Sequence, residues 1–135
     1  MGKSAYAILI VDDNEPSRLL IAHHISQELK SAEITLAGSG EAALQLAHKN
    51  VYDVILLDLL MPEIGGFEVL KRIRTDSMNK STPIVIVSVR GTSTLFHEES
   101  VSVEDAESLG ANAVMFKPFT HQELISAVKT QLGAM

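Results

Sequence analysis

Five polar residues stand directly after short apolar runs, and their types suit phosphoryl chemistry. They are Asp12 and Asp13 after residues 6–11, Asp58 after 53–57, Ser88 after 83–87, and Lys117 after 113–116. Three carboxylates held close together repel, so either one acid stays protonated or a hard cation such as Mg²⁺ sits among them. The hydroxyl and the amine supply a donor and a cation for phosphoryl oxygens. This set predicts that Asp58 is a nucleophile that accepts a phosphoryl group, helped by a metal and a lysine.

The apolar runs that precede these residues have the length and composition of strands buried on both faces, which are typical of parallel sheets. The strands are expected at residues 6–11, 33–37, 53–57, 83–87 and 113–116. Between them, apolar residues recur at helical spacing. The first helix starts near Pro16 and carries Leu19 and Ile25 inward, and Ser39 caps the second. Gly110 ends a short fourth helix, and a capping box opens the last one at residues 120–123.

Five strands that alternate with five helices predict an α/β fold with a doubly wound parallel sheet. Strand–helix–strand crossovers are right-handed almost without exception, so helices must cover both faces. The carboxyl ends of parallel strands lie at one edge, where ligands bind in open α/β sheets. The five polar residues are therefore expected to meet at that edge.

The composition is that of one soluble domain of 135 residues, with 46% hydrophobic and 21% charged residues. No apolar run is long enough to span a bilayer, no signal peptide is evident, and there is no Cys. These features fit a cytoplasmic protein. The net charge of −6 argues against a non-specific nucleic-acid binder, which needs a cationic face.

Each polar residue also has a plain structural interpretation. Asp12 and Asp13 suit the cap of the first helix, where the helix dipole favours anions, and Asp58 suits a turn. Lys117 suits a surface lysine, and Ser88 a loop hydroxyl. What these interpretations explain poorly is the conjunction, with these residues placed at the ends of four different apolar runs.

With these motifs in order, the chain resembles the receiver domain of two-component response regulators, of the single-domain CheY-like kind. The resemblance covers about residues 6–132 and implies one receiver domain over 1–135, with the flavodoxin-like strand order 2-1-3-4-5. The matching residues are Asp12-Asp13, Asp58 with Met61-Pro62 and Gly66, Ser88, and Lys117-Pro118-Phe119.

The resemblance implies that Asp58 accepts a phosphoryl group from the phosphohistidine of a sensor histidine kinase or a histidine phosphotransfer protein. It implies that Mg²⁺ is the cofactor. Asp13, Asp58 and the backbone carbonyl of Leu60 would bind the ion, and Asp12 would act largely through water. The domain would then be a phosphoprotein with at most slow autodephosphorylation, not an enzyme.

In this family Ser88 and Lys117 would bind the phosphoryl oxygens, Lys117 having paired with Asp58 at rest. The contact would repack the face built from the fourth helix, fifth strand and fifth helix, and so change the binding of a downstream effector protein. The chain would be a monomer or a weak phosphorylation-dependent dimer. Direct nucleic-acid or membrane binding is not expected.

The sequence departs from the family pattern around this output region. Position 114, which usually holds an aromatic switch residue, is Val114, so that rotamer switch is absent or replaced. Ser88 and Lys117 are 29 positions apart (117 − 88), several more than is typical, and the extra residues are placed around 91–100.

Three further residues are expected to tune the site. Val89 stands where a small residue is usual and is expected to narrow access to Asp58. The resemblance implies that Leu60 and Arg90, each two residues past a site residue, occupy positions that tune the rate of dephosphorylation. Leu60 has no polar group to orient an attacking water.

Two other functions fit parts of the pattern. One is a receiver-like interaction module that never carries phosphate. The intact set of acids and lysine argues against it, whereas Val89, Val114 and the long segment leave it open. The other is an Mg²⁺-dependent phosphohydrolase with an aspartate nucleophile, although such enzymes place two acids one residue apart after the first strand and carry a cap. The five histidines are interpreted as surface or packing residues.

Overall fold

The computed structural model describes residues 5–89 and 103–133. In these ranges five strands alternate with five helices, as predicted. They are β1 (Ala7–Val11), α1 (Glu15–Glu28), β2 (Glu33–Ala37), α2 (Gly40–Lys49), β3 (Val54–Leu57), α3 (Gly66–Thr75), β4 (Ile84–Val89), α4 (Val103–Ser108), β5 (Ala113–Lys117) and α5 (His121–Leu132). None of these helices combines the length and the apolar character that crossing a membrane requires.

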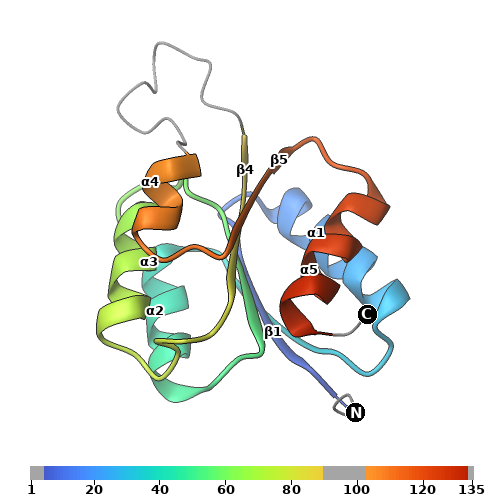
Figure 1. Cartoon of the computed structure of the whole chain (residues 1–135), viewed down its shortest axis with the longest axis horizontal. Coiled ribbons are helices and arrows are strands. Elements are labelled where there is room, and N and C mark those ends of the chain that lie inside the picture. Colours follow the sequence, from blue (N-terminus) through green and yellow to red (C-terminus); the bar gives the residue numbers. More distant parts are fainter. Residues whose placement is uncertain (1–4, 90–102, 134–135) are drawn as a thin grey trace.

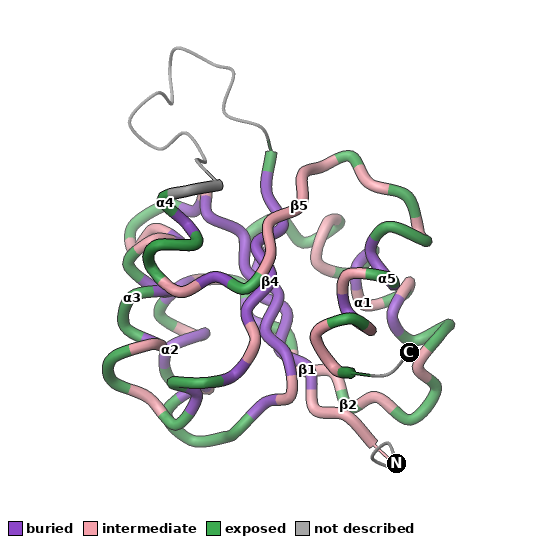
Figure 2. Tube along the Cα trace, viewed as in Figure 1, coloured by how far each residue is buried: buried purple, intermediate pink, exposed green. Residues whose placement is uncertain are grey.

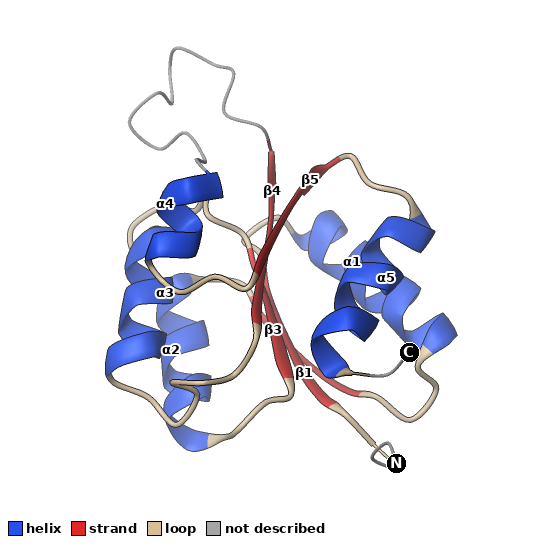
Figure 3. Cartoon of the chain, viewed as in Figure 1, coloured by secondary structure: helices blue, strands red, loops and turns tan. Residues whose placement is uncertain are grey.

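The strands form one parallel sheet in the order β2-β1-β3-β4-β5, between two layers of helices (Figures 1 and 3). α1 and α5 cover one face, and α2, α3 and α4 cover the other. Ile8 and Ile10 of β1 pack on the α1/α5 side, and Leu9 and Val11 pack on the other. Because both faces are covered, the central strands are buried along their length (Figure 2), which explains their continuous apolar runs.

The helices begin at caps that the sequence encodes locally. Ser39 accepts a hydrogen bond from the backbone of Ala42, and the capping box of Thr120 and Glu123 is present, both as predicted. The inward placement of Leu19 was wrong, because its side chain is 50% exposed. Ile21 and Ile25 are the buried residues of α1, one turn apart, and Leu19 lies off the face that they define.

β4 and β5 are longer than predicted, and this changes where two site residues lie. Parallel pairing continues through Ser88 with Phe116 and through Val89 with Lys117. Ser88 and Lys117 are therefore strand residues, held by the ladder of backbone hydrogen bonds, and do not follow the strands. The predicted loop that begins at Arg90 falls outside the described residues.

The first turn of α3 approaches the segment after β3 very closely. The backbone N–H of Gly66 donates to the carbonyl of Leu59 at 3.0 Å. A Cβ atom added at Gly66 would collide with Cα of Leu59 and lie 2.5 Å from the carbonyl oxygen of Asp58. Nothing lies within 4 Å of a Cβ added at the neighbouring Gly65. Only Gly at position 66 lets the first turn of α3 pack this closely against the backbone of Asp58 and Leu59, which follow β3.

Candidate functional site

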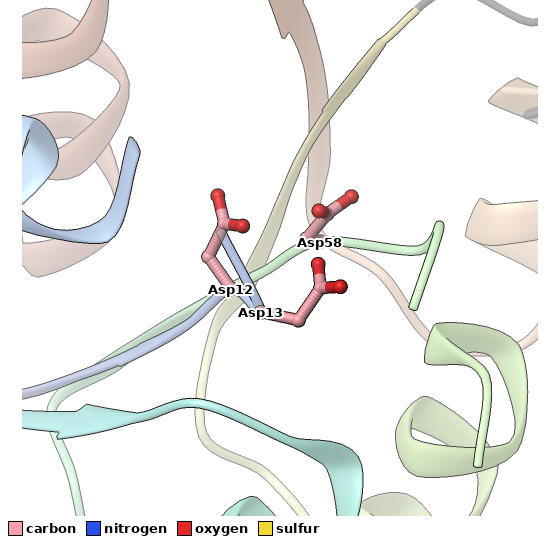
Figure 4. Close-up of side chains that lie close together, drawn as sticks. All are labelled: Asp12, Asp13 and Asp58. Carbon is pink, nitrogen blue, oxygen red and sulfur yellow. The ribbon is translucent and has the colours of Figure 1, made fainter. Parts of the chain in front are cut away.

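Three carboxylates meet at the carboxyl edge of the sheet (Figure 4). Asp12 and Asp13 follow β1, and Asp58 follows the neighbouring strand β3. One oxygen from each lies within 4.8 Å of the others. Asp12 and Asp58 are buried and Asp13 is exposed, so the cluster opens to solvent on one side. The convergence that the sequence predicts for these acids is present.

Asp58 is held in one orientation by donors from two elements. The hydroxyl of Ser88 donates to Oδ1 at 2.8 Å, and the backbone N–H of Leu60 donates to the same oxygen at 3.1 Å. Nζ of Lys117 lies 3.7 Å from Oδ2. Burial raises the pKa of Asp58, and the charge of Asp12 adds to the rise, against the lowering effects of Lys117, Ser88 and the Leu60 N–H. The carboxylate of Asp58 is thus held in one orientation, but its donors and Lys117 do not fully compensate for the burial of its negative charge.

Asp12 is the better compensated of the two buried acids. Its Oδ2 accepts hydrogen bonds from Nζ of Lys117 at 2.7 Å and from the hydroxyl of Ser17 at 2.8 Å, and its Oδ1 accepts one from the N–H of Asn14 at 2.9 Å. The expected resting partner of Lys117 was Asp58, yet the shorter ion pair is with Asp12. Because Nζ of Lys117 also lies 3.7 Å from Oδ2 of Asp58, this one cation serves both buried carboxylates.

The structure excludes the helix-cap interpretation of the acid pair. The cap of α1 is Asn14, whose side chain accepts from the N–H of Ser17 at 2.8 Å. Asp12 and Asp13 are therefore not needed as the cap. Ser17 is a site residue that the sequence reasoning missed. The available signal was a hydroxyl in the first turn of the helix that directly follows the acid pair.

A family model for the response regulator receiver domain matches residues 8–129. The chain belongs to this family. The transcriptional regulatory protein SrrA of Staphylococcus aureus is 39% identical over 125 residues, which are 93% of this chain and 47% of SrrA. The receiver domain thus spans about half the length of the curated relatives it matches. Receiver domains are signalling switches that bind Mg²⁺ at an acidic site.

Solved receiver domains share the fold. Chemotaxis response regulator CheY4 of Vibrio cholerae is 30% identical, with a TM-score of 0.77 over 95% of this chain and 99% of its own. The receiver domain of sensor histidine kinase PA1611 from Pseudomonas aeruginosa is 24% identical, with a TM-score of 0.80 over 96% and 98%. That structure holds a magnesium ion in its active-site cleft. These likenesses confirm the predicted fold class and strand order.

The residues expected to tune this receiver domain lie on different sides of the sheet. Val114 is partly buried and packs with the α2, α3 and α4 layer. Val89 is half exposed at the end of β4 and lines a hollow with Lys117 and Phe119. The narrowing of access by Val89 stays a prediction. Arg90 and the extra residues around 91–100 lie outside the described part of the chain.

Proposed function

We propose that this receiver domain is a phosphoacceptor switch of a two-component phosphorelay, with Asp58 as the acceptor. The observation that carries the proposal is the arrangement of the Asp58 oxygens. Oδ1 accepts two hydrogen bonds, whereas Oδ2 faces Nζ of Lys117 at 3.7 Å. Oδ2 would attack phosphorus while the P–N bond of the phosphohistidine breaks, and the leaving imidazole would keep that electron pair. The donor would be a sensor histidine kinase or a histidine phosphotransfer protein.

The acid cluster fits Mg²⁺, which takes a few carboxylate oxygens and keeps several waters. Asp13, Asp58 and the backbone carbonyl of Leu60 would hold the ion. Both oxygens of Asp12 already accept hydrogen bonds, which favours a contact through water for this residue. Bound Mg²⁺ would neutralise charge on the oxygens of the transferring phosphoryl group.

The response to phosphorylation would start at Ser88 and Lys117, which would bind the phosphoryl oxygens. Both residues lie at the paired ends of β4 and β5, so a shift of either is passed to the neighbouring strand. The face of α4, β5 and α5 would then repack and change its affinity for an effector protein, without the aromatic switch that Val114 replaces. SrrA is named a transcriptional regulatory protein, so a link to transcription is among the outputs to test.

The proposal is tested by intact-mass spectrometry after incubation with acetyl phosphate and Mg²⁺. We expect one added phosphoryl group on the wild type and on Asp76→Asn, a control at an exposed aspartate beyond α3. Asp58→Asn and a metal-free sample should gain none. Phosphorylation of Asp58→Asn would overturn the proposal. If folded wild type gained none from acetyl phosphate or a phosphohistidine donor, a phosphorylation-independent interaction module would be favoured. Steady release of phosphate from a generic ester would indicate a phosphohydrolase.

The side chain of Leu60 is expected to lengthen the phosphorylated lifetime. Its backbone N–H orients Asp58, while its apolar side chain offers nothing to position an attacking water. We expect Leu60→Asn to lose phosphate about fivefold faster, because one hydrogen bond to that water is worth about 1 kcal/mol. Leu60→Met should behave like the wild type. The measurement is the decay of the phosphorylated mass after the phosphodonor is removed, and equal decay of Leu60→Asn and wild type would contradict the prediction.

A further inference from the structure

Two histidines far apart in the chain meet between α1 and α5. His24 lies on α1, and His121 is the first residue of α5. Their Nδ1 atoms are 2.6 Å apart, and their ring centroids are 4.8 Å apart. Both side chains are partly buried. The sequence predicted that the five histidines are surface or packing residues, and 97 positions separate this pair.

The surroundings of His121 decide where its proton lies. Its Nε2 is 2.9 Å from Oε1 of Glu28, which lies one turn after His24 on α1. A carboxylate only accepts, so Nε2 of His121 carries a proton and donates it. In its neutral form this ring has a lone pair at Nδ1, the atom that lies 2.6 Å from Nδ1 of His24. The two facing nitrogens either share one proton or offer two lone pairs to one cation.

We propose that His24 and His121 form a binding site for a borderline transition-metal ion such as Zn²⁺, Ni²⁺ or Cu²⁺, through their Nδ1 atoms. Imidazole suits these ions, whereas Mg²⁺ prefers oxygen ligands. Glu28 supplies a typical second requirement of such sites, a carboxylate that accepts the other N–H of a ligating histidine and fixes its ring. Water would complete the coordination, as in open zinc sites.

The required movement is small. Two nitrogens that each lie about 2.0–2.1 Å from a tetrahedral Zn²⁺ are about 3.3 Å apart. The two nitrogens therefore need to move apart by less than about 1 Å from the 2.6 Å contact, and the rings need to turn so that both lone pairs point at the ion. Burial, and then the neighbouring His121 and His23, lowers the pKa of His24, which favours the neutral ring that metals bind. The packing of α1 on α5 already holds the two side chains in place.

This site is chemically and spatially separate from the acid cluster, and the inference goes beyond the proposed phosphoacceptor function. Its ligands are side chains of α1 and α5, the two helices that cover one face of the sheet, whereas the acids follow the strands β1 and β3. A bound ion would join α1 to the start of α5, four residues after Lys117 in the chain. His24 also packs edge-on against Phe119 in the same segment.

The site is tested by calorimetric titration of untagged protein with Zn²⁺, in a large excess of Mg²⁺ that occupies the acid cluster. We expect one Zn²⁺ per chain in the wild type and at least tenfold weaker binding in His24→Gln and in His121→Gln. Glu28→Gln should lower the affinity for Zn²⁺ by 10–100-fold, the usual effect of removing a carboxylate that orients a ligating histidine. His23→Gln, at the adjacent and exposed histidine, is the matched control and should bind like the wild type.

Two further measurements separate a metal site from other outcomes. Electron paramagnetic resonance of bound Cu²⁺ should show two coordinating nitrogens in the wild type and fewer in His24→Gln and in His121→Gln. Circular dichroism and melting without metal establish that the variants fold, and Zn²⁺ should raise the melting temperature of the wild type alone. Loss of Zn²⁺ binding in Asp58→Asn would assign the ion to the acid cluster and overturn the proposal. If the wild type bound no Zn²⁺, or if His24→Gln and His121→Gln bound it as tightly as the wild type, the proposal would also be overturned. The two histidines would then be a hydrogen-bonded pair.

Discussion

Gly66→Ala should lower the free energy of unfolding by about 2–4 kcal/mol and also weaken Mg²⁺ binding and phosphorylation. The added methyl would collide with Cα of Leu59 and lie 2.5 Å from the carbonyl oxygen of Asp58. Both are backbone atoms that cannot rotate away, so either α3 or the segment after β3 must move. That segment carries the proposed acceptor and the Leu60 N–H that orients it. A packing defect outside the site would therefore also displace Asp58 and weaken Mg²⁺ binding and phosphorylation.

The neighbouring glycine provides the matched control. Gly65 has a φ of −71°, and a Cβ added there has open space around it. Gly65→Ala should change stability by less than about 1 kcal/mol, because a poorer helix cap is offset by a less flexible unfolded chain. Urea denaturation of the two variants measures the difference, with m-values checked for constancy. If the free energies of unfolding of Gly66→Ala and Gly65→Ala agree within about 0.5 kcal/mol, the close approach of α3 to the segment after β3 does not exist in solution.

Asp58→Asn should make the protein more stable than the wild type at neutral pH in the presence of a chelator. The pKa of Asp58 is raised in the folded state, chiefly by burial. Folding therefore favours the protonated acid, and the stability from this group is full below the unfolded pKa and lost as pH rises through the folded pKa. An asparagine stays neutral and avoids this loss. We expect a gain on the order of 1–2 kcal/mol, the scale on which one buried polar group changes stability.

The pH and metal dependence of this gain distinguish it from a simple packing effect. The gain should disappear below about pH 4, where the wild-type acid is protonated in both states. Added Mg²⁺ should stabilise the wild type by mass action and reduce or reverse the difference, because the variant lacks a proposed ligand. Thermal or urea unfolding at several pH values makes the comparison. A variant no more stable than the wild type at pH 7 without metal would show that ionised Asp58 is fully compensated in the fold.

The fold follows from signals that are local in the sequence. A run such as Val54–Leu57 is apolar at every position because helices cover both faces of the sheet, so run length and periodicity are enough to predict the strand. Helix caps at Ser39 and Thr120 are equally local. The error at Leu19 arose because α1 carries apolar residues on more than one face, and tertiary packing selects Ile21 and Ile25.

The convergence of the acids was predictable from the sequence, but several of the side-chain contacts at the site were not. Parallel strands bring Asp12, Asp13 and Asp58 to one edge whatever the details of packing. The choice of Asp12 as the closer partner of Lys117, the hydroxyl of Ser17 and the contact between two distant histidines depend on side-chain geometry across the fold. No spacing rule encodes such contacts, because their partners lie on elements joined only by tertiary packing.

The order in which the site residues are encoded has a consequence for biosynthesis. All three acids belong to the first 58 residues, and the strands that carry them pair directly, β1 with β3. Lys117 belongs to β5, which is synthesised after the other four strands of this sheet and forms one of its edges. A nascent chain that stops before β5 would hold two buried carboxylates without their lysine. We expect such a chain to remain open until β5 is available, so that the cation completes both the site and the fold.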